Sequence, residues 1–245
     1  MYWQELTTKA FAETAVGRVD TVLIPVGSVE AHGLHLPLGS DNYAPEALCR
    51  QLERRYPERV AVAPTIAYGH AWELANWPGT LSLSSRVVAD YAAEVGRATV
   101  NWGMRHVIFM NGHGGNVGPL TEALERVAEL GAKALLINWR QDFSAEILTV
   151  ASAQGHAGED ETSVLLAIHK DLVFMQDAQE NPHRQRALRI KSEDMLEKRF
   201  RHALTGNAKP SSAEKGEQIL SLIDQRLADL IEDVWADRLF EERRD

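Results

Sequence analysis

Short segments rich in β-branched residues alternate along this chain with longer segments of helical periodicity, and this alternation restricts the fold more than any other feature. We predict strands at Thr21–Val26, residues 60–64 and residues 134–138, and a fourth within RHVIFMNGHGGN (105–116). Helices are predicted at residues 42–56, 85–103, 117–130 and 159–169, and from 213 to about 238. Such alternation is typical of βαβ units, so the predicted fold class is α/β with a mainly parallel sheet covered on both faces.

Three local features bear on this prediction. Pro25 is the weak point of the first strand, because proline cannot donate a hydrogen bond to a sheet. Ser40 or Asp41 lies where the N-cap of the first helix is expected. Residues 201–216 are expected to form a less ordered loop before the final helix. Without repeats or low-complexity segments, we expect one domain over residues 1–245.

The composition is that of a globular protein, with 44% hydrophobic and 25% charged residues in 245. No apolar run approaches the roughly 20 residues of a membrane span, so no membrane partner is expected. The start has an acid at Glu5 and no apolar signal core, which predicts a cytoplasmic protein. Cys49 is the single cysteine and has no partner within the chain. Any metal must therefore be held by histidine and carboxylate side chains.

The net charge of −9 argues against a nucleic-acid partner, because phosphate binding requires a basic surface. The one basic stretch, residues 183–189, sits among acids and is expected to be a solvated face. We expect a small-molecule partner instead.

Two predicted strand ends carry side chains that bind metals. The loop after the first strand carries Glu30, His32 and His35, with Asp41 further on, and NGHGGN carries His113. Ligands of open parallel sheets bind at the carboxyl ends of strands, and carboxylates with imidazoles suit zinc, manganese or iron. Asp41 is the natural bridge between two ions. The alternatives are a helix N-cap for Asp41, a turn histidine for His113 and a packing histidine for His35.

A third segment, QGHAGEDETSVLLAIH (154–169), places His156, Glu159 and Glu161 around the start of a helix. One of the carboxylates could serve as a metal ligand or general base, and His156 as the acid for a leaving group. The alternative is that acids near a helix N-terminus only stabilise the helix.

Aromatic side chains are dense in YGHAWELANWPGTLSLS (68–84), which contains His70, Trp72, Glu73 and Trp77. Together with Trp139, at another predicted strand end, these residues could form a substrate wall. A small satellite of the core is the alternative.

Four of these segments resemble, in the same order, the motifs of the creatininase family of metal-dependent amidohydrolases: VGSVEAHGLHLPLGSD, YGHAWELANWPGTLSL, NGHGGN and GHAGEDETS. The resemblance runs from about residue 21 to 168, with a weaker echo in SSAEKG. It implies a three-layer α/β/α sandwich, often assembled as a hexamer, hence a homo-oligomer. It also implies that Glu30, His32, Asp41 and His113 are metal ligands, with Asp41 as the bridge. Family members include creatininase, a formamide deformylase, a peptidase acting on a cofactor precursor, and ring-opening hydrolases of sugar-like ketones.

The chain departs from creatininase proper at Gly115, where the resemblance would place a glutamate two residues beyond His113. The second metal then needs another ligand, for which Glu161 is the candidate and Glu159 the alternative. Creatinine is accordingly not the expected substrate.

The main functional hypothesis is a hydrolase that uses two divalent ions and a bridging water to cleave a non-peptide C–N bond, a cyclic amide or formamide. Glu30, Asp41 and His113 would hold one ion, and His32, Asp41 and Glu161 the other. His156 would protonate the leaving nitrogen or hold the oxyanion, and the N–H groups of Gly114 and Gly115 could add donors. The alternatives are ring opening of a polyhydroxylated cyclic ketone or lactone, and a metal-stabilised binding protein without catalysis. The sequence has no G-x-S-x-G elbow and no G-K-[ST] phosphate loop.

Overall fold

A four-stranded parallel sheet forms the centre of the protein, whose computed structural model describes residues 1–181 and 191–240. The strand order is β2 (Val60–Val62), β1 (Thr21–Val26), β3 (His106–Asn111) and β4 (Lys133–Asn138). The basic stretch at residues 183–189 lies outside the described residues. Among the helices of the described part, none is both long enough and apolar enough to cross a membrane.

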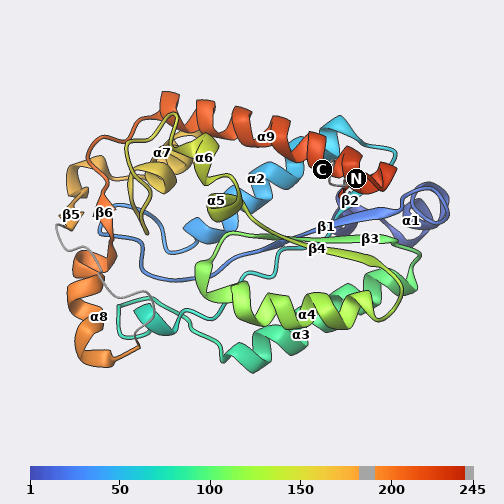
Figure 1. Cartoon of the computed structure of the whole chain (residues 1–245), viewed down its shortest axis with the longest axis horizontal. Coiled ribbons are helices and arrows are strands. Elements are labelled where there is room, and N and C mark those ends of the chain that lie inside the picture. The colour runs from blue at the N-terminus through green and yellow to red at the C-terminus, as the bar shows by residue number, and fades with distance from the viewer. Residues whose placement is uncertain (182–190, 241–245) are drawn as a thin grey trace, which may run out of the picture.

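Helices cover both faces of the sheet, so the predicted three-layer α/β arrangement is confirmed (Figure 1). One face is covered by α2 (Ser40–Arg55), α7 (Glu159–Ile168) and α9 (Ala213–Ala236), with the short α5 (Trp139–Asp142) and α6 (Ser144–Ile147). The other face is covered by α3 (Ser85–Asn101) and α4 (Val117–Ala128), with α1 (Thr8–Thr14) beside them.

The strands feed two separate hydrophobic cores because successive side chains of a strand point to opposite faces. In β1, Val22 and Ile24 pack with the α3 and α4 layer, whereas Leu23 packs with α2 and α9. All six residues of β1 are buried. This is the pattern of a central parallel strand, and it explains why the segment is apolar without alternation.

Pro25 is accommodated in β1 because the neighbouring strand is short. β2 ends at Val62 and pairs only with Thr21 to Leu23, so no ladder hydrogen bond is required from position 25 on that side. The carbonyl of Pro25 accepts a hydrogen bond from the Ile66 amide at 2.9 Å instead.

The boundaries of several elements differ from the sequence predictions. α2 begins at Ser40 with Gly39 as its N-cap, so Asp41 lies in the first turn and is not the cap. Residues 201–216 are more regular than expected, since β6 (Gly206–Asn207) pairs with β5 (Glu180–Asn181) after α8 (Glu193–Arg199). Short 3₁₀ turns occupy Trp3–Glu5, Trp72–Leu74, Gly114–Asn116, Lys170–Leu172, Met175–Asp177 and Arg201–Ala203.

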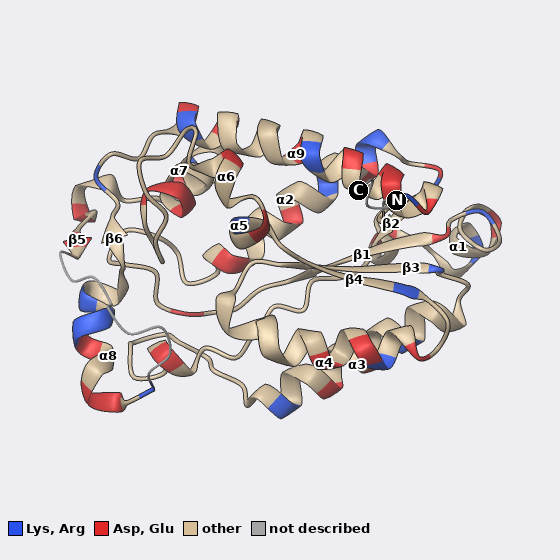
Figure 2. Cartoon of the chain, viewed as in Figure 1, with Lys and Arg blue, Asp and Glu red and all other residues tan. Residues whose placement is uncertain are grey.

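Charged residues lie mostly on the outer helices and loops (Figure 2). Acidic residues at the beginnings of α2 and α7 are exceptions: Asp41, Glu159, Asp160 and Glu161 are buried, as is Glu30 in the loop after β1. Buried carboxylates are costly unless they are paired or coordinate a metal. Each of these carboxylates therefore requires an ion-pair partner or a metal.

Candidate metal centre and cavity

Residues from four separate parts of the chain meet at the carboxyl end of the sheet. Glu30 and His32 lie in the loop after β1, Asp41 in the first turn of α2, His113 after β3 and Glu161 in the first turn of α7. Parallel strands present their carboxyl ends at one edge, which is why these distant positions converge.

Asp41 stands at the centre of this cluster. Its Oδ1 lies 3.0 Å from His32 Nε2, and its Oδ2 lies 3.0 Å from His113 Nδ1. Glu30 Oε1 completes one group at 3.3 Å from His113 Nδ1, and Glu161 Oε2 completes the other at 3.8 Å from His32 Nε2. Within each group the potential ligand atoms all lie within 4.8 Å of one another. The two groups are the same two that the sequence hypothesis assigned to two ions.

Each histidine of the cluster uses its second ring nitrogen on a backbone carbonyl. His32 Nδ1 lies 3.1 Å from the Glu30 carbonyl, and His113 Nε2 lies 3.0 Å from the His70 carbonyl. A carbonyl can only accept, so these nitrogens carry the proton and the nitrogens facing Asp41 keep the lone pair in the neutral ring. Histidine ligands of metals are oriented in this way.

One oxygen in the cluster lacks a hydrogen bond. Asp41 Oδ2 is buried and has no hydrogen-bond partner within the described part of the chain, although His113 Nδ1 lies 3.0 Å away. Two ligand atoms that approach without hydrogen bonding fit an ion placed between them, so the residues present suit a divalent cation.

The carboxylates of the cluster raise the pKa values of its two histidines. Burial alone would lower the pKa of His32, but Asp41 and, after it, Glu161 and Glu30 raise that pKa to about 9. Burial would likewise lower the pKa of His113, but the carboxylates of Glu30 and Asp41 raise it well above its usual value. These histidines bind protons where cations could bind instead, which is the electrostatic condition for a metal site.

The two predicted glutamates of α7 have different surroundings. Glu161 faces the cluster: Oε1 accepts from Arg140 Nη1 at 2.5 Å and Oε2 from the Ala157 amide at 2.6 Å. Burial raises the pKa of Glu161 to about 7, against the opposing effect of Arg140.

Glu159 is not part of this cluster, contrary to its prediction as a catalytic residue and alternative ligand. Its carboxylate is ion-paired with Lys215 at 2.6 Å and accepts from the Ser152 amide at 2.9 Å. Positions two apart on a helix point about 200° apart, so Glu159 and Glu161 cannot both face one site.

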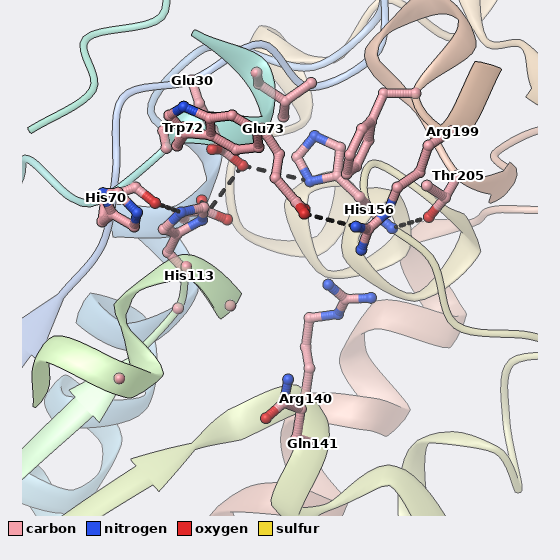
Figure 3. Close-up of a pocket in the computed structure, with 18 of the residues that line it drawn as sticks. Glu30, His70, Trp72, Glu73, His113, Arg140, Gln141, His156, Arg199 and Thr205 are labelled. Atoms are coloured by element: carbon pink, nitrogen blue, oxygen red, sulfur yellow. Dashed lines mark hydrogen bonds and ion pairs between the residues drawn. The ribbon is translucent and has the colours of Figure 1, made fainter. Parts of the chain in front are cut away.

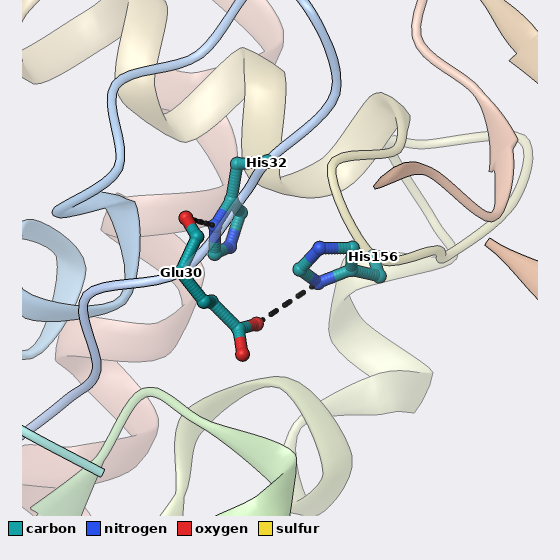
Figure 4. Close-up of side chains that lie close together, drawn as sticks. All are labelled: Glu30, His32 and His156. Carbon is teal, nitrogen blue, oxygen red and sulfur yellow. Dashed lines mark hydrogen bonds and ion pairs between the residues drawn. The ribbon is translucent and has the colours of Figure 1, made fainter. Parts of the chain in front are cut away.

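His156 also reaches the cluster, next to Glu30 and His32 (Figure 4). Its Nδ1 lies 3.5 Å from Glu30 Oε1, and its Nε2 lies 2.8 Å from the Ala31 carbonyl. Burial, followed by the charge of His32, lowers the pKa of His156 well below its usual value. The neutral ring presents a lone pair at Nδ1, so His156 in this state can accept a proton there.

His35 stays outside the cluster, as its alternative interpretation predicted. Its Nε2 lies 2.8 Å from Thr162 Oγ1, and it belongs to neither ligand group. It is therefore a packing histidine behind the site.

A cavity of about 890 Å³ opens onto the cluster (Figure 3). Five of the predicted substrate-contacting residues line it: His70, Trp72, Glu73, Gly114 and Gly115. It is also lined by residues that sequence reasoning missed, chiefly Arg140, Gln141, Lys191, Arg199, Phe200 and Thr205. Arg140 and Gln141 follow the predicted strand-end residue Trp139, so their position was a usable signal. The other four residues follow no predicted strand.

Two predicted aromatic contacts do not line this cavity. Trp139 is 2% exposed and packs in the core between the sheet and α9. Trp77 is partly buried against a small apolar cluster that includes Leu74 and Phe200. For Trp77 the satellite-core alternative is the one observed.

Gly115 is required by the histidine arrangement. A Cβ at this position would collide with the His70 carbonyl and lie 2.5 Å from His113 Nε2. A side chain here would break the hydrogen bond that orients His113, so this local backbone has no room for a glutamate at position 115.

Comparison with known proteins shows the family of this chain. The family model for creatininase, described as creatinine amidohydrolase, matches residues 4–231. The chain belongs to the creatininase family.

Relatives within this family carry different names. The chain is 38% identical over 160 residues to the mycofactocin precursor peptide peptidase of Mycolicibacterium smegmatis, covering 64% of this chain and 61% of that protein. It therefore spans less than two thirds of that relative's length. It is 28% identical over 256 residues to the creatinine amidohydrolase of Pseudomonas putida, covering 93% and 94%. A solved structure named as a manganese form of creatininase matches with a TM-score of 0.85 and 27% identity, over 95% of this chain and 97% of that one.

Proposed function

We propose that this creatininase-family hydrolase is a dinuclear enzyme that cleaves an amide C–N bond of a small molecule, with a cyclic amide or formamide as the leading class. Glu30, Asp41 and His113 would hold one divalent ion, and His32, Asp41 and Glu161 the other. The observation that carries the proposal is the position of Asp41, which presents one oxygen at 3.0 Å to each of two histidines. A carboxylate shared in this way is how two-metal hydrolases hold ions about 3.5 to 4 Å apart.

When bound, two divalent ions would supply a hydroxide near neutral pH and polarise the carbonyl under attack. The nitrogen and oxygen donors, without thiolate, suit zinc, manganese or iron. Around them the protein contributes orientation: backbone carbonyls fix the rings of His32 and His113, and Arg140 and the Ala157 amide fix Glu161. The amides of Gly114 and Gly115, which line the cavity, could donate to the oxyanion.

His156 would move the proton. Its free Nδ1 faces Glu30 at 3.5 Å, while the Ala31 carbonyl holds its Nε2. In this arrangement His156 takes a proton at Nδ1 from the attacking water and returns it to the leaving nitrogen. The low pKa of the free ring favours the accepting form at the start of the cycle.

Peptide-bond hydrolysis is a second candidate. It is supported by the 38% identity to a protein named as a peptide peptidase, although that alignment spans only part of both chains. A cavity of about 890 Å³ has room for a short peptide segment. Ring opening of a cyclic ketone or lactone remains the alternative that leaves no amine among the products.

The test is metal analysis of untagged protein together with a substrate panel. About two equivalents of zinc, manganese or iron per chain are expected, with the loss of both ions and of all activity in Asp41→Ala. The panel contains formamides, cyclic amides, short peptides and lactones, and amine release identifies C–N cleavage. A metal-replete, active Asp41→Ala protein would overturn the ligand assignment. Oligomeric state and cytoplasmic location stay predictions from the sequence.

A further inference from the structure

Cationic side chains share the cavity with the metal cluster. Arg140, at the start of α5, and Arg199, at the end of α8, both extend into it, from opposite sides in the view of Figure 3. Lys191 lies beside them. Among the described lining residues the only carboxylate outside the metal groups is Glu73.

Both arginines retain unused hydrogen-bond donors. Arg140 donates from Nε to Asp160 at 2.9 Å and from Nη1 to Glu161 at 2.5 Å, and Arg199 donates from Nη1 to Glu73 at 2.6 Å. Within the described residues, Arg140 Nη2 and Arg199 Nε and Nη2 have no protein acceptor. A guanidinium stays charged at all accessible pH values and binds carboxylates in a two-pronged geometry.

The charge balance of the cavity favours an anion. Glu73 alone faces the two cations Lys191 and Arg199, both of which bond to it. The lining carries four carboxylates and three side-chain cations, and Asp160, outside the lining, pairs with Arg140 at 2.9 Å. With these five carboxylates counted, two divalent ions would leave two positive charges in excess. A concave site with such an excess attracts and holds a negatively charged substrate.

The same wall has aromatic surfaces next to the proposed proton carrier. The Arg199 guanidinium lies 4.9 Å from the Phe200 ring centre, and the rings of Phe200 and His156 are 5.7 Å apart, edge to face. Lys191 Nζ lies 5.7 Å from the centre of the Trp72 ring. The anion site is therefore on the side of His156, where the leaving nitrogen would be protonated.

We propose that Arg140 and Arg199 bind a carboxylate on the leaving-amine side of the substrate, so that the substrate class is an N-acylated amino acid with a free carboxylate. The C-terminal residue of a short peptide is one form of that class. The inference rests on the proposed function, because it assigns the amine side from His156.

The test compares N-formyl and N-acetyl amino acids, including N-formyl-L-phenylalanine, each with its own carboxamide. In the metal-loaded protein kcat/KM is expected to favour the carboxylate by about tenfold to a hundredfold, the value of a hydrogen-bonded charge. Arg199→Gln should bring the ratio close to one, mainly through KM, and Arg199→Lys should retain part of it. Arg201→Gln is the matched control, because this exposed arginine two residues away does not line the cavity. Equal rates on both members of every pair, or an unchanged ratio in Arg199→Gln, would overturn the inference.

Calorimetric binding of N-acetyl-L-phenylalanine and its carboxamide separates this inference from the proposed function. If nothing in the panel is hydrolysed but the carboxylate binds more tightly and Arg199→Gln removes that preference, the proposed function fails and the anion site stands. If amides are hydrolysed without any carboxylate preference in rate or binding, the anion site fails and the function stands. A preference that survives in Arg199→Gln would mean that Arg199 does not bind the carboxylate, and it would contradict the proposal.

Discussion

At the scale of single residues, two glutamates in one helical turn have different roles because different groups face them. Glu161 meets a histidine of the cluster, whereas Glu159 meets Lys215 and the Ser152 amide. Sequence alone left the choice between them open, since both lie in the first turn of one helix. The direction of each side chain around the helix axis separates them.

Glutamine substitution at these two positions should therefore have different effects. Glu161→Gln is expected to weaken metal binding at one site by more than tenfold, because a neutral amide replaces a charged ligand. Glu159→Gln should leave the metal content unchanged and lower the free energy of unfolding by about 1–3 kcal/mol, because it leaves Lys215 without its buried partner. Elemental analysis and urea unfolding of both variants provide the comparison. If Glu159→Gln lost metal and Glu161→Gln did not, the assignment of Glu161 as the ligand would be contradicted.

The pKa values of the cluster predict how metal-free protein responds to pH. The folded pKa of His32, about 9, lies above its ordinary value of 6.5, so its proton stabilises the fold fully below pH 6.5. That contribution is lost as the pH rises through about 9. Glu161, with a pKa of about 7 against 4.5, acts in the same direction at lower pH.

Urea unfolding in the presence of a chelator should show the free energy of unfolding falling between pH 6.5 and 9, by an amount on the order of 3 kcal/mol from His32. Metal-loaded protein should lack this fall, because coordinated rings are already deprotonated. A metal-free protein that becomes more stable over this range would contradict the assigned electrostatics.

At the scale of elements, the sheet and its covering helices could be predicted from sequence because each strand of the central sheet is a short apolar run and α3, α4 and α9 are amphipathic. Helix ends were less certain: Gly39, with no capping side chain, precedes α2 where Ser40 or Asp41 was expected. The two-residue strands β5 and β6 are too short for any periodicity to reveal. Trp139 shows the limit of strand-end reasoning, since an aromatic residue there can point into the core as well as into a cavity.

Close packing of α7 against α9 depends on Gly216. A Cβ there would collide with the Ser163 carbonyl and lie 2.9 Å from Ala167 Cβ. Gly216→Ala should lower the free energy of unfolding by about 1–3 kcal/mol, because the two helices would have to separate. Gly118→Ala in α4 is the control, since no atom lies within 4 Å of its added Cβ; helix propensity predicts a gain of roughly 0.5–1 kcal/mol. Thermal unfolding of both variants provides the measurement. Equal changes in stability would contradict the close packing of α7 against α9 at Gly216.

At the scale of the whole molecule, the candidate ligands that the family motifs single out lie close together, because the loops after β1 and β3 and the first turns of α2 and α7 meet at the carboxyl end of the sheet. The opposite wall of the cavity escaped sequence reasoning, because Arg199 and Phe200 come from a region without strands of detectable length. Their contact with the site depends on how residues beyond 190 fold back toward the sheet, and local sequence patterns do not encode this.

Removal of metal should lower the stability of the entire protein. Ions held by Glu30, His113 and Glu161 would join the loops after β1 and β3 to α7, and ligands that bind only the folded state stabilise it by mass action. At a free metal concentration a thousandfold above the dissociation constant, the gain is about 4 kcal/mol per ion. Differential scanning calorimetry with and without chelator should show a lower Tm for the metal-free protein. An unchanged Tm after confirmed metal loss would contradict a site that joins these elements.

The separation of Glu30 and Glu161 along the chain also bears on the order of folding. These positions lie on opposite sides of β3 and β4 in sequence, so they can approach only after most of the sheet has paired. Contacts of such high sequence separation form late, because loop closure must first be overcome. In a nascent chain the proposed set of Glu30, Asp41 and His113 would be complete in sequence after β3, whereas the set of His32, Asp41 and Glu161 would lack Glu161 until α7 has been synthesised. Binding of the second ion would therefore be a late maturation step that does not nucleate the fold.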